Sequence, residues 1–388
     1  MARIKTHLRS GSRAEAKRLF ARTPMKQHVA SAFVFFVLWS AFGFAAIHAQ
    51  RLPVFPYAEG WLGADAAYSI PLAPGRSLWL FGDTFVGDPG TTLRANFKAM
   101  VRNSIGIGIC ERNKACTIRY YWSSQYAAKP RSFFDSGKDD VWYWPLDGYL
   151  DGKTLYLSLM VVRNRPGASS KDAMGFEVVG TKWASVTNLS APPDRWKISL
   201  RDMTGANMLT GVSIVAVGRF LLLYTHVIEA QGRGYMALLR VPRDKIADPA
   251  SHWEYLGRDS KWRLGTPHGD ALHVIDQPIS EMSVRYHPQW KVWVAVSAGP
   301  GPTSNHIVAR IADTPEGPWS EPITIFQFPE MTQNFDRDTF CYAAKEHIEF
   351  DDSNLVVTYA CNSFSFEKVI NNMAIYRPQV VVLPRPQP

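Results

Sequence analysis

Two aspartates, Asp65 and Asp83, lie in the stretch WLGADAAYSIPLAPGRSLWLFGDTFVG, which spans residues 61–87. This pattern is typical of two β-strands joined by a tight turn, whose centre falls between Pro74 and Gly75. Antiparallel pairing about that turn places the two aspartates nearly opposite each other, with Cβ atoms expected about 5 Å apart. Because like charges this close repel, we expect one carboxyl to keep its proton to a higher pH than an isolated aspartate does.

A protonated acid beside a carboxylate is the pair of groups that glycoside hydrolysis requires. One group donates a proton to the leaving oxygen, and the other attacks the anomeric carbon, stabilises it or activates water. The alternative is structural, because an aspartate after glycine at a strand end commonly accepts backbone N–H bonds in a turn. The sequence favours the first interpretation and predicts that Asp65 and Asp83 are a catalytic pair.

The pair belongs to a unit that recurs along the chain, in which a strand, a tight polar turn and a strongly apolar strand follow one another. The starts of the five apolar strands are 77, 66, 72 and 63 residues apart. This recurrence predicts an all-β fold, a five-bladed β-propeller over residues 50–388. A two-domain β-sandwich is the alternative, which such regularity disfavours. The apolar strands are residues 77–83, 154–160, 220–226, 292–298 and 355–361.

In a propeller the first strand of each blade lines the central channel, and its first residues lie at one mouth, where we expect ligands to bind. A carboxylate facing a mostly apolar channel costs free energy unless it is used or paired. We therefore expect Asp147 and Glu281 to bind substrate beside the aspartate pair. The five inner strands are expected to begin near Asp65, Asp147, Ser213, Glu281 and Tyr342.

Four further side chains are candidates for substrate binding at the same mouth. Trp144 offers an aromatic face for a sugar ring, with packing between blades as the alternative. His226 ends the third apolar strand and either binds sugar hydroxyls or is packed. Arg285 either forms a structural pair with Glu281 or holds an anionic group. Asn103 either lines the mouth of the first blade or caps the backbone.

The first 49 residues form a basic and then apolar leader. Residues 1–26 hold eight basic residues against one acid, and residues 27–49 hold no Lys, Arg, Asp or Glu. This pattern predicts a signal peptide cut between Ala49 and Gln50. The alternative is an uncleaved anchor in the inner membrane formed by residues 30–48. Both place the rest of the chain outside the cytoplasm, in the periplasm or the extracellular space.

The charge that remains excludes one class of function. Removing the leader from the totals of 43 basic and 34 acidic residues leaves 35 and 33, a net charge of +2. A nearly neutral domain does not carry the basic surface of a nucleic-acid-binding protein. No cofactor or metal motif is found, so we expect neither an organic cofactor nor a metal site, and we expect a monomer.

The four cysteines suit an oxidising compartment, where two disulfides form. Cys110 and Cys116 flank a hairpin tip, and Cys341 and Cys361 lie on neighbouring strands. Four buried free thiols are the alternative. The spacing lacks the CxxC pattern of zinc sites.

Several motifs resemble one group of proteins. The chain from about residue 61 to 383 resembles the bacterial five-bladed β-propeller group, long called a domain of unknown function, that includes endo-D-arabinanases. The resemblance implies a propeller acting on furanosides, with the two motif aspartates at Asp65 and Asp83. The basic leader and the segment between Cys110 and Cys116 depart from the group. The motifs are GADAAYSIPLAPGRSLWLFGDTFVG, MVRNSIGI, YWPLDGYLDGKTLYL, EMSVRYHPQWKVWVAV, CYAAKEHIEF and LVVTYACNS.

The segment ADTPEGPWSEP, residues 312–322, also resembles a blade of the wider arabinanase and β-xylosidase propellers. Those families use a base on the first blade and a second Asp and a Glu acid on others, which Asp65, Asp147 and Glu281 could supply. We prefer the adjacent pair. The expected function is a glycoside hydrolase that cleaves furanosidic, arabinan-type links, D-arabinan among them, in cell-envelope or environmental glycans. The alternative is a non-catalytic propeller that binds a polysaccharide or oligosaccharide or serves as a scaffold.

Overall fold

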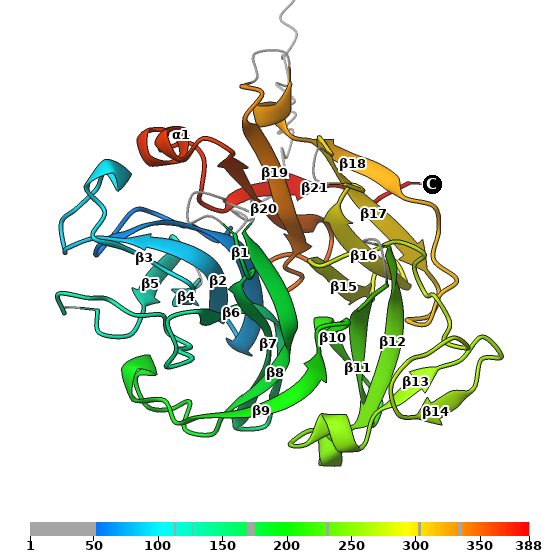
Figure 1. The fold of residues 1–388 in the computed structure, drawn as a ribbon. Coiled ribbons are helices and arrows are strands. Elements are labelled where there is room, and N and C mark those ends of the chain that lie inside the picture. Colours follow the sequence, from blue (N-terminus) through cyan, green and yellow to red (C-terminus); the bar gives the residue numbers. More distant parts are fainter. Residues whose placement is uncertain are drawn as a thin grey trace, which may run out of the picture. The chain divides into compact units, whose positions relative to one another are not determined.

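Five antiparallel sheets surround a central axis in the computed structural model (Figure 1). The structure describes residues 52–111, 114–125, 127–168, 175–229, 233–301, 304–332 and 336–387. The leader predicted over residues 1–49, with its cleavage site and its alternative anchor, lies outside these residues. Within the described part of the chain, no helix has the length and apolar character needed to cross a membrane.

Each sheet is one blade, and its strands follow one another outward from the axis. Blade one holds β1 (Trp61–Ala73), β2 (Arg76–Val86), β4 (Ser104–Ile109) and β5 (Thr117–Tyr121), with β3 (Ala99–Val101) paired to β2. Blade two holds β6 (Val141–Asp151), β7 (Thr154–Asn164), β8 (Phe176–Val186) and β9 (Ile198–Gly205). Blade three holds β10 (Met208–Val217), β11 (Phe220–Ile228), β12 (Gly234–Pro242), β13 (Glu254–Leu256) and β14 (Trp262–Leu264).

The last two blades and the short helices complete the described fold. Blade four holds β15 (Met282–His287), β16 (Val292–Ala298), β17 (His306–Ala312) and β18 (Ile323–Gln327). Blade five holds β19 (Thr339–Glu346), β20 (Leu355–Ser363) and β21 (Gln379–Leu383). The helices are α1 (Phe366–Asn371) and the 3₁₀ turns η1 (Arg94–Asn96), η2 (Pro193–Arg195), η4 (Arg243–Lys245), η5 (Pro249–Ser251) and η6 (Pro329–Met331).

The first strand of every blade contacts the first strands of its two neighbours. The contacts run from β1 to β6, β10, β15 and β19 and back to β1, which closes a ring of five inner strands. The predicted five-bladed β-propeller is therefore confirmed. The five predicted apolar strands are also confirmed, since they are β2, β7, β11, β16 and β20.

The apolar strands are buried on both faces because neighbouring blades stack on each other. Leu78 and Leu80 of β2 and Leu157 and Leu159 of β7 belong to one core cluster, and each is fully buried. Removing this much apolar surface from water is the main stabilising contribution to such a fold. The result is a rigid ring whose inner strands hold their channel-facing side chains in fixed positions.

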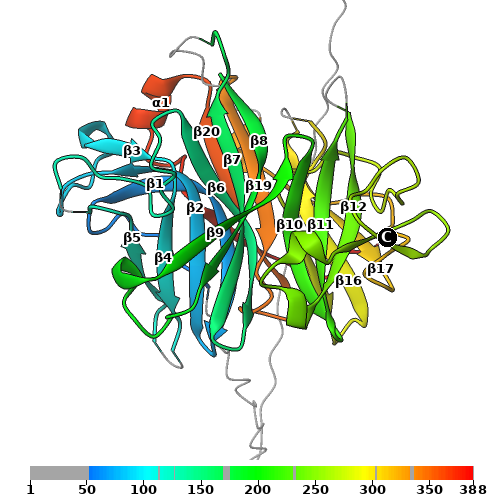
Figure 2. The ribbon, with the colours of Figure 1, turned by 60° about the horizontal axis from the view of Figure 1, so that its bottom comes forward.

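Two disulfides crosslink neighbouring strands, one in the first blade and one in the last blade. Cys110 is bonded to Cys116 at the tip of the β4–β5 hairpin, and Cys341 to Cys361 across β19 and β20, which confirms both predicted pairs. α1 lies beside β20 and η1, at the rim shared by blades one and five (Figure 2). This seam between the first and last blades is where the candidate site lies.

Candidate functional site

Asp65 and Asp83 face each other across a break in the β1–β2 ladder. Asp65 is the one residue of β1, and Gly82 and Asp83 the two residues of β2, between successive ladder pairs. Ala66 and Ala67 have φ values of 68° and 67°, so this bulge uses left-handed backbone at two consecutive positions. The predicted opposition of the two aspartates is therefore present, with an irregular rather than a continuous ladder. The flanking pairs are Ala64–Thr84 and Ala66–Phe81.

Gly82 provides the space into which Asp65 turns. A Cβ atom added to Gly82 would lie 2.3 Å from Oδ1 of Asp65. A side chain at position 82 would displace the Asp65 carboxyl, and the GD dipeptide lies inside β2 rather than at its end. Its glycine accommodates one carboxyl group, and its aspartate supplies the other.

Asp83 is surrounded by groups that favour its charged form. Arg102 donates from Nη1 to Oδ2 at 3.1 Å, and Trp144 donates from Nε1 to Oδ1 at 2.8 Å. The guanidinium of Arg102 also lies 4.3 Å from the ring centre of Trp142. Burial raises the pKa of Asp83, and both donors oppose that rise. The Asp83 side chain keeps 15% of its surface exposed.

Asp65 accepts fewer hydrogen bonds than Asp83 does. Its Oδ2 accepts a hydrogen bond from the hydroxyl of Tyr342 at 2.5 Å. The pKa of Asp65 is raised to about 8, chiefly by burial and next by the negative charge of Asp83, while the Tyr342 bond and the Lys345 charge oppose the rise. The raised pKa of Asp65 agrees with the expectation that one carboxyl of the pair keeps its proton to a higher pH than an isolated aspartate does.

Glu281 and Lys345 form an ion pair next to Asp65. Lys345 Nζ lies 2.9 Å from Glu281 Oε1 and also donates to the carbonyl of Ala343. It lies 4.2 Å from the ring centre of Tyr68. Burial lowers the pKa of Lys345, and the Glu281 carboxylate opposes that change. Glu281 therefore reaches the site as predicted, although its partner is Lys345.

Asp147 and Arg285 belong to the channel wall. Asp147 is fully buried, and its Oδ2 accepts from the backbone N–H of Ile214 at 2.8 Å and from Arg285 at 3.2 Å. These bonds join blades two, three and four. Arg285 is in a structural ion pair, one of its two predicted roles, but its partner is Asp147 rather than Glu281. With no exposed surface, Asp147 braces the channel and presents no oxygen to a ligand at the mouth.

Two more predicted residues are not brought to the carboxyl pair. Asn103 is fully buried and bonds the backbone of Phe134 and Tyr143 through its whole amide, so it is the capping alternative that the structure supports. His226 lies on β11 opposite Leu209 and Met236, and burial lowers its pKa to about 4. Among the described residues its ring nitrogens have no hydrogen-bond partner. Its predicted contact with sugar stays untested.

Sequence reasoning missed three residues at the site. Tyr342 was noted only as a strand start, and Lys345 and Arg102 were not singled out. One signal was present for Lys345, because a lysine inside the apolar inner strand CYAAKE requires a buried partner. Arg102 and Tyr342 gave no local signal, since their partners lie on other strands.

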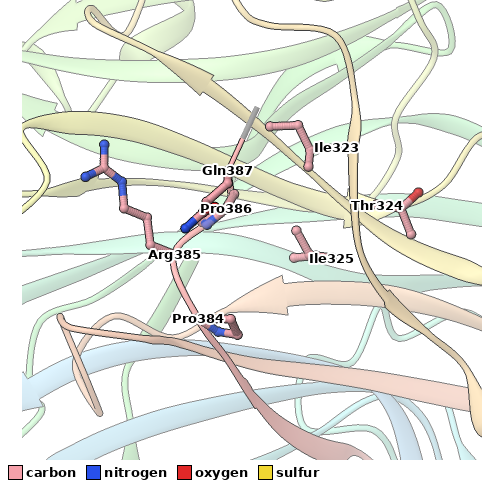
Figure 3. A pocket seen from close by; sticks show the side chains of 7 residues that line it. All are labelled: Ile323, Thr324, Ile325, Pro384, Arg385, Pro386 and Gln387. Carbon is pink, nitrogen blue, oxygen red and sulfur yellow. The ribbon is translucent and has the colours of Figure 1, made fainter.

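A hollow on the surface lies elsewhere. It opens between β18 and the C-terminal segment 384–387, and Figure 3 shows the side chains that line it. Arg385 is the only charged residue in its lining, which contains no carboxyl group. It is therefore not the place where the acid chemistry suggested by Asp65 and Asp83 would occur.

The raised pKa of Asp65 predicts a pH-dependent stability. The ordinary value is 3.8 and the folded value about 8, so between these pH values the folded state holds a proton that unfolding releases. Stability therefore falls as the pH rises through that window. We expect Asp65→Asn, which is neutral at every pH, to gain at least about 1 kcal/mol at pH 8, or roughly 2–4 °C in Tm.

Thermal unfolding at pH 4, 6 and 8 tests this expectation. The advantage of Asp65→Asn should grow with pH and be small at pH 4, close to the ordinary value of 3.8, where much of the unfolded state still holds the proton. Asp88→Asn is the matched control, because Asp88 is 70% exposed beside Lys98 on the same blade. An Asp65→Asn protein that is no more stable than the wild type at pH 8 would contradict the assigned protonation.

Three comparisons with known proteins bear on this chain. The family described as Domain of unknown function (DUF5005) matches residues 54–383. Among curated proteins, the Notoamide biosynthesis cluster protein J' of Aspergillus versicolor is 31% identical over 212 residues, which are 50% of this chain and 52% of that protein. The chain thus spans about half the length of this curated relative.

Among solved structures, a crystal structure from Bacteroides ovatus ATCC 8483, provisionally described as a hydrolase, has a TM-score of 0.63 at 18% identity. The similarity covers 84% of this chain and 86% of that one. The α-L-arabinofuranosidase PaAbf62A from Podospora anserina, solved with cellotriose, has a TM-score of 0.45 at 10% identity, covering 87% and 95%. At 18% identity the Bacteroides ovatus structure supports the fold alone. The family match covers most of the propeller, so the chain belongs to the family Domain of unknown function (DUF5005).

Proposed function

We propose that this protein is a glycoside hydrolase whose catalytic pair is Asp65 and Asp83. The observation that carries the proposal is the opposition of two carboxyls whose surroundings differ in polarity. Asp65 accepts one hydrogen bond, from a hydroxyl, and its pKa is raised by burial and by the charge of Asp83, whereas Asp83 receives two hydrogen bonds from N–H donors, one of them charged. Environments that favour opposite protonation states in neighbouring carboxyls are the arrangement that supplies an acid and a base at one pH.

The roles follow from these surroundings. Asp65 holds a proton near neutral pH and donates it to the leaving oxygen of the glycosidic bond. Asp83 is the carboxylate that attacks the anomeric carbon or activates water. Arg102 and Trp144 fix the Asp83 carboxylate in place. Trp144 thus acts through Asp83, in addition to the sugar contact predicted for it.

The alternative scheme, with Asp65 as base and Glu281 as acid, is less well supported. Glu281 lies 2.9 Å from the ammonium of Lys345, so its carboxyl is engaged in an ion pair. Asp147, which that scheme needs as a third carboxyl, is enclosed in the channel wall. The ion pair with Lys345 holds Glu281 at the mouth, where we propose that it binds substrate.

The substrate class comes from the sequence resemblance. The motifs around Asp65 and Asp83 resemble propellers that act on furanosides, so we propose arabinan-type links, with D-arabinan included. The basic and apolar leader supports an exported enzyme acting on cell-envelope or environmental glycans, either released or anchored by residues 30–48. We propose that it acts as a monomer.

A digest of a glycan panel tests this function. The purified protein is incubated with L-arabinan, D-arabinan, arabinogalactan, arabinoxylan, xylan and starch, and new reducing ends are measured and the products sized. Release of arabinose or arabino-oligosaccharides is the expected result. Binding without new reducing ends would replace the hydrolase with the non-catalytic alternative, and cleavage of a pyranosidic glycan alone would overturn the furanoside assignment.

A further inference from the structure

Blade five presents a row of aromatic side chains. The innermost of them, Tyr342, contacts Asp65. Alternate residues of a strand share one face, so Phe340 and Tyr342 of β19 lie on the same side of the sheet. Asn362 of β20 pairs directly with Phe340 and therefore shares that side, and Phe364 follows two residues later. The row thus runs from Tyr342, whose hydroxyl bonds Asp65, through Phe340 to Phe364.

The three rings are stacked in sequence. The ring centres of Tyr342 and Phe340 are 5.5 Å apart at an interplanar angle of 28°, and those of Phe340 and Phe364 are 4.5 Å apart at 30°. Phe364 is 56% exposed, although it is a large apolar side chain. We call Tyr342, Phe340 and Phe364 the aromatic platform. Its outer ring meets solvent while its inner ring touches the candidate acid.

We propose that the aromatic platform binds the sugar residues of a glycan chain next to the bond held by Asp65 and Asp83. This inference rests on the proposed function and adds a binding site to it. The apolar faces of sugar rings stack on aromatic rings, and an exposed aromatic face is costly in water unless a ligand covers it. Asn362 borders the platform, and its amide nitrogen lies 3.4 Å from the Tyr342 hydroxyl, so polar groups accompany the rings.

The length of the platform indicates a polymeric substrate. Each step from Tyr342 to Phe340 along β19 advances about 6.6 Å, at roughly 3.3 Å per residue. A ligand that touches both Asp65 and the exposed ring of Phe364 must therefore extend over more than one sugar. The platform favours binding of long chains over short ones, which is a property of enzymes that cut inside a polymer.

A second exposed phenylalanine nearby provides a matched control. Phe366 in α1 is 58% exposed, close to the exposure of Phe364. Its ring packs towards Phe85 and Phe97, at 6.1 Å and 6.3 Å between centres, and is not part of the stack. Removing Phe366 therefore takes away similar apolar surface at the same rim without shortening the platform.

The test compares chain lengths in Phe364→Ala, Phe364→Tyr and Phe366→Ala. The probes are the disaccharide and the hexasaccharide of linear arabinan and a 4-nitrophenyl arabinofuranoside. For Phe364→Ala we expect KM for the hexasaccharide to rise about tenfold, the value for one lost stacking contact, with the two short probes within about twofold of the wild type. Phe364→Tyr keeps the ring and should restore the wild-type KM.

The outcomes separate this inference from the function on which it rests. An unchanged hexasaccharide KM in Phe364→Ala, or an equal rise in Phe366→Ala, overturns the platform while wild-type turnover preserves the hydrolase. A wild-type protein that neither cleaves nor binds any of the probes overturns both. The Tm and the secondary structure of each variant are measured alongside the kinetics. A folding defect would lower the activity on all three probes.

Discussion

Replacing Asp83 by asparagine is expected to lower glycan hydrolysis by about 10³-fold or more, and Asp65→Asn is expected to have an effect of similar size. An asparagine at position 83 has one accepting oxygen, so it keeps at most one of the bonds from Arg102 and Trp144, and it cannot attack a carbon atom or deprotonate water. The asparagine at position 65 accepts the bond from Tyr342 but has no acidic proton to give. Each variant therefore removes one chemical step with little change in side-chain volume.

Initial rates on the glycan identified by the panel measure these losses. Asp88→Asn removes a carboxylate from the same blade at an exposed position and should retain the wild-type rate. Circular dichroism and Tm establish that the variants are folded. If Asp65→Asn or Asp83→Asn keeps a rate within tenfold of the wild type, that aspartate is not part of the mechanism. If both variants do so, the proposed catalytic pair is wrong.

Arg94→Met is expected to be the most destabilising single change. Arg94 has no exposed surface, and its guanidinium donates to the backbone carbonyls of Leu62, Val369, Asn372 and Ile375. These bonds join β1 to α1 and to the chain that follows it, so they hold blade one to blade five. Methionine leaves several buried carbonyls without a donor, which we expect to cost about 4 kcal/mol and to lower Tm by about 10 °C.

Thermal and denaturant unfolding measure this effect. Arg94→Lys is predicted to recover little, because an ammonium cannot reach carbonyls on both sides as a planar guanidinium does. Arg119→Met is the control. Arg119 lies on the same blade, is 65% exposed and forms a long ion pair with Glu59, at 3.9 Å. A Tm for Arg94→Met within about 2 °C of the wild type would show that this seam is held by other contacts.

The sequence determined the features that arise within one hairpin or one repeated unit. The turn at Pro74 and Gly75 sets the register of β1 and β2, so Asp65 and Asp83 could be placed opposite each other by counting. The same local logic gave the Cys110–Cys116 bridge. The spacing of the five apolar strands gave the number of blades, because each strand had to bury two faces and only stacking of repeated sheets accomplishes that.

Only the tertiary structure decided which side chains meet between blades. Tyr342 reaches Asp65, and Lys345 reaches Glu281, across seams joined by no common turn, so no count along the chain finds them. The sequence offered Glu281, four residues away, as one partner for Arg285, and the structure pairs Arg285 with Asp147 from two blades earlier. Contacts within a strand pair follow from periodicity, whereas contacts across the channel depend on how each blade packs against the next and how far each side chain extends.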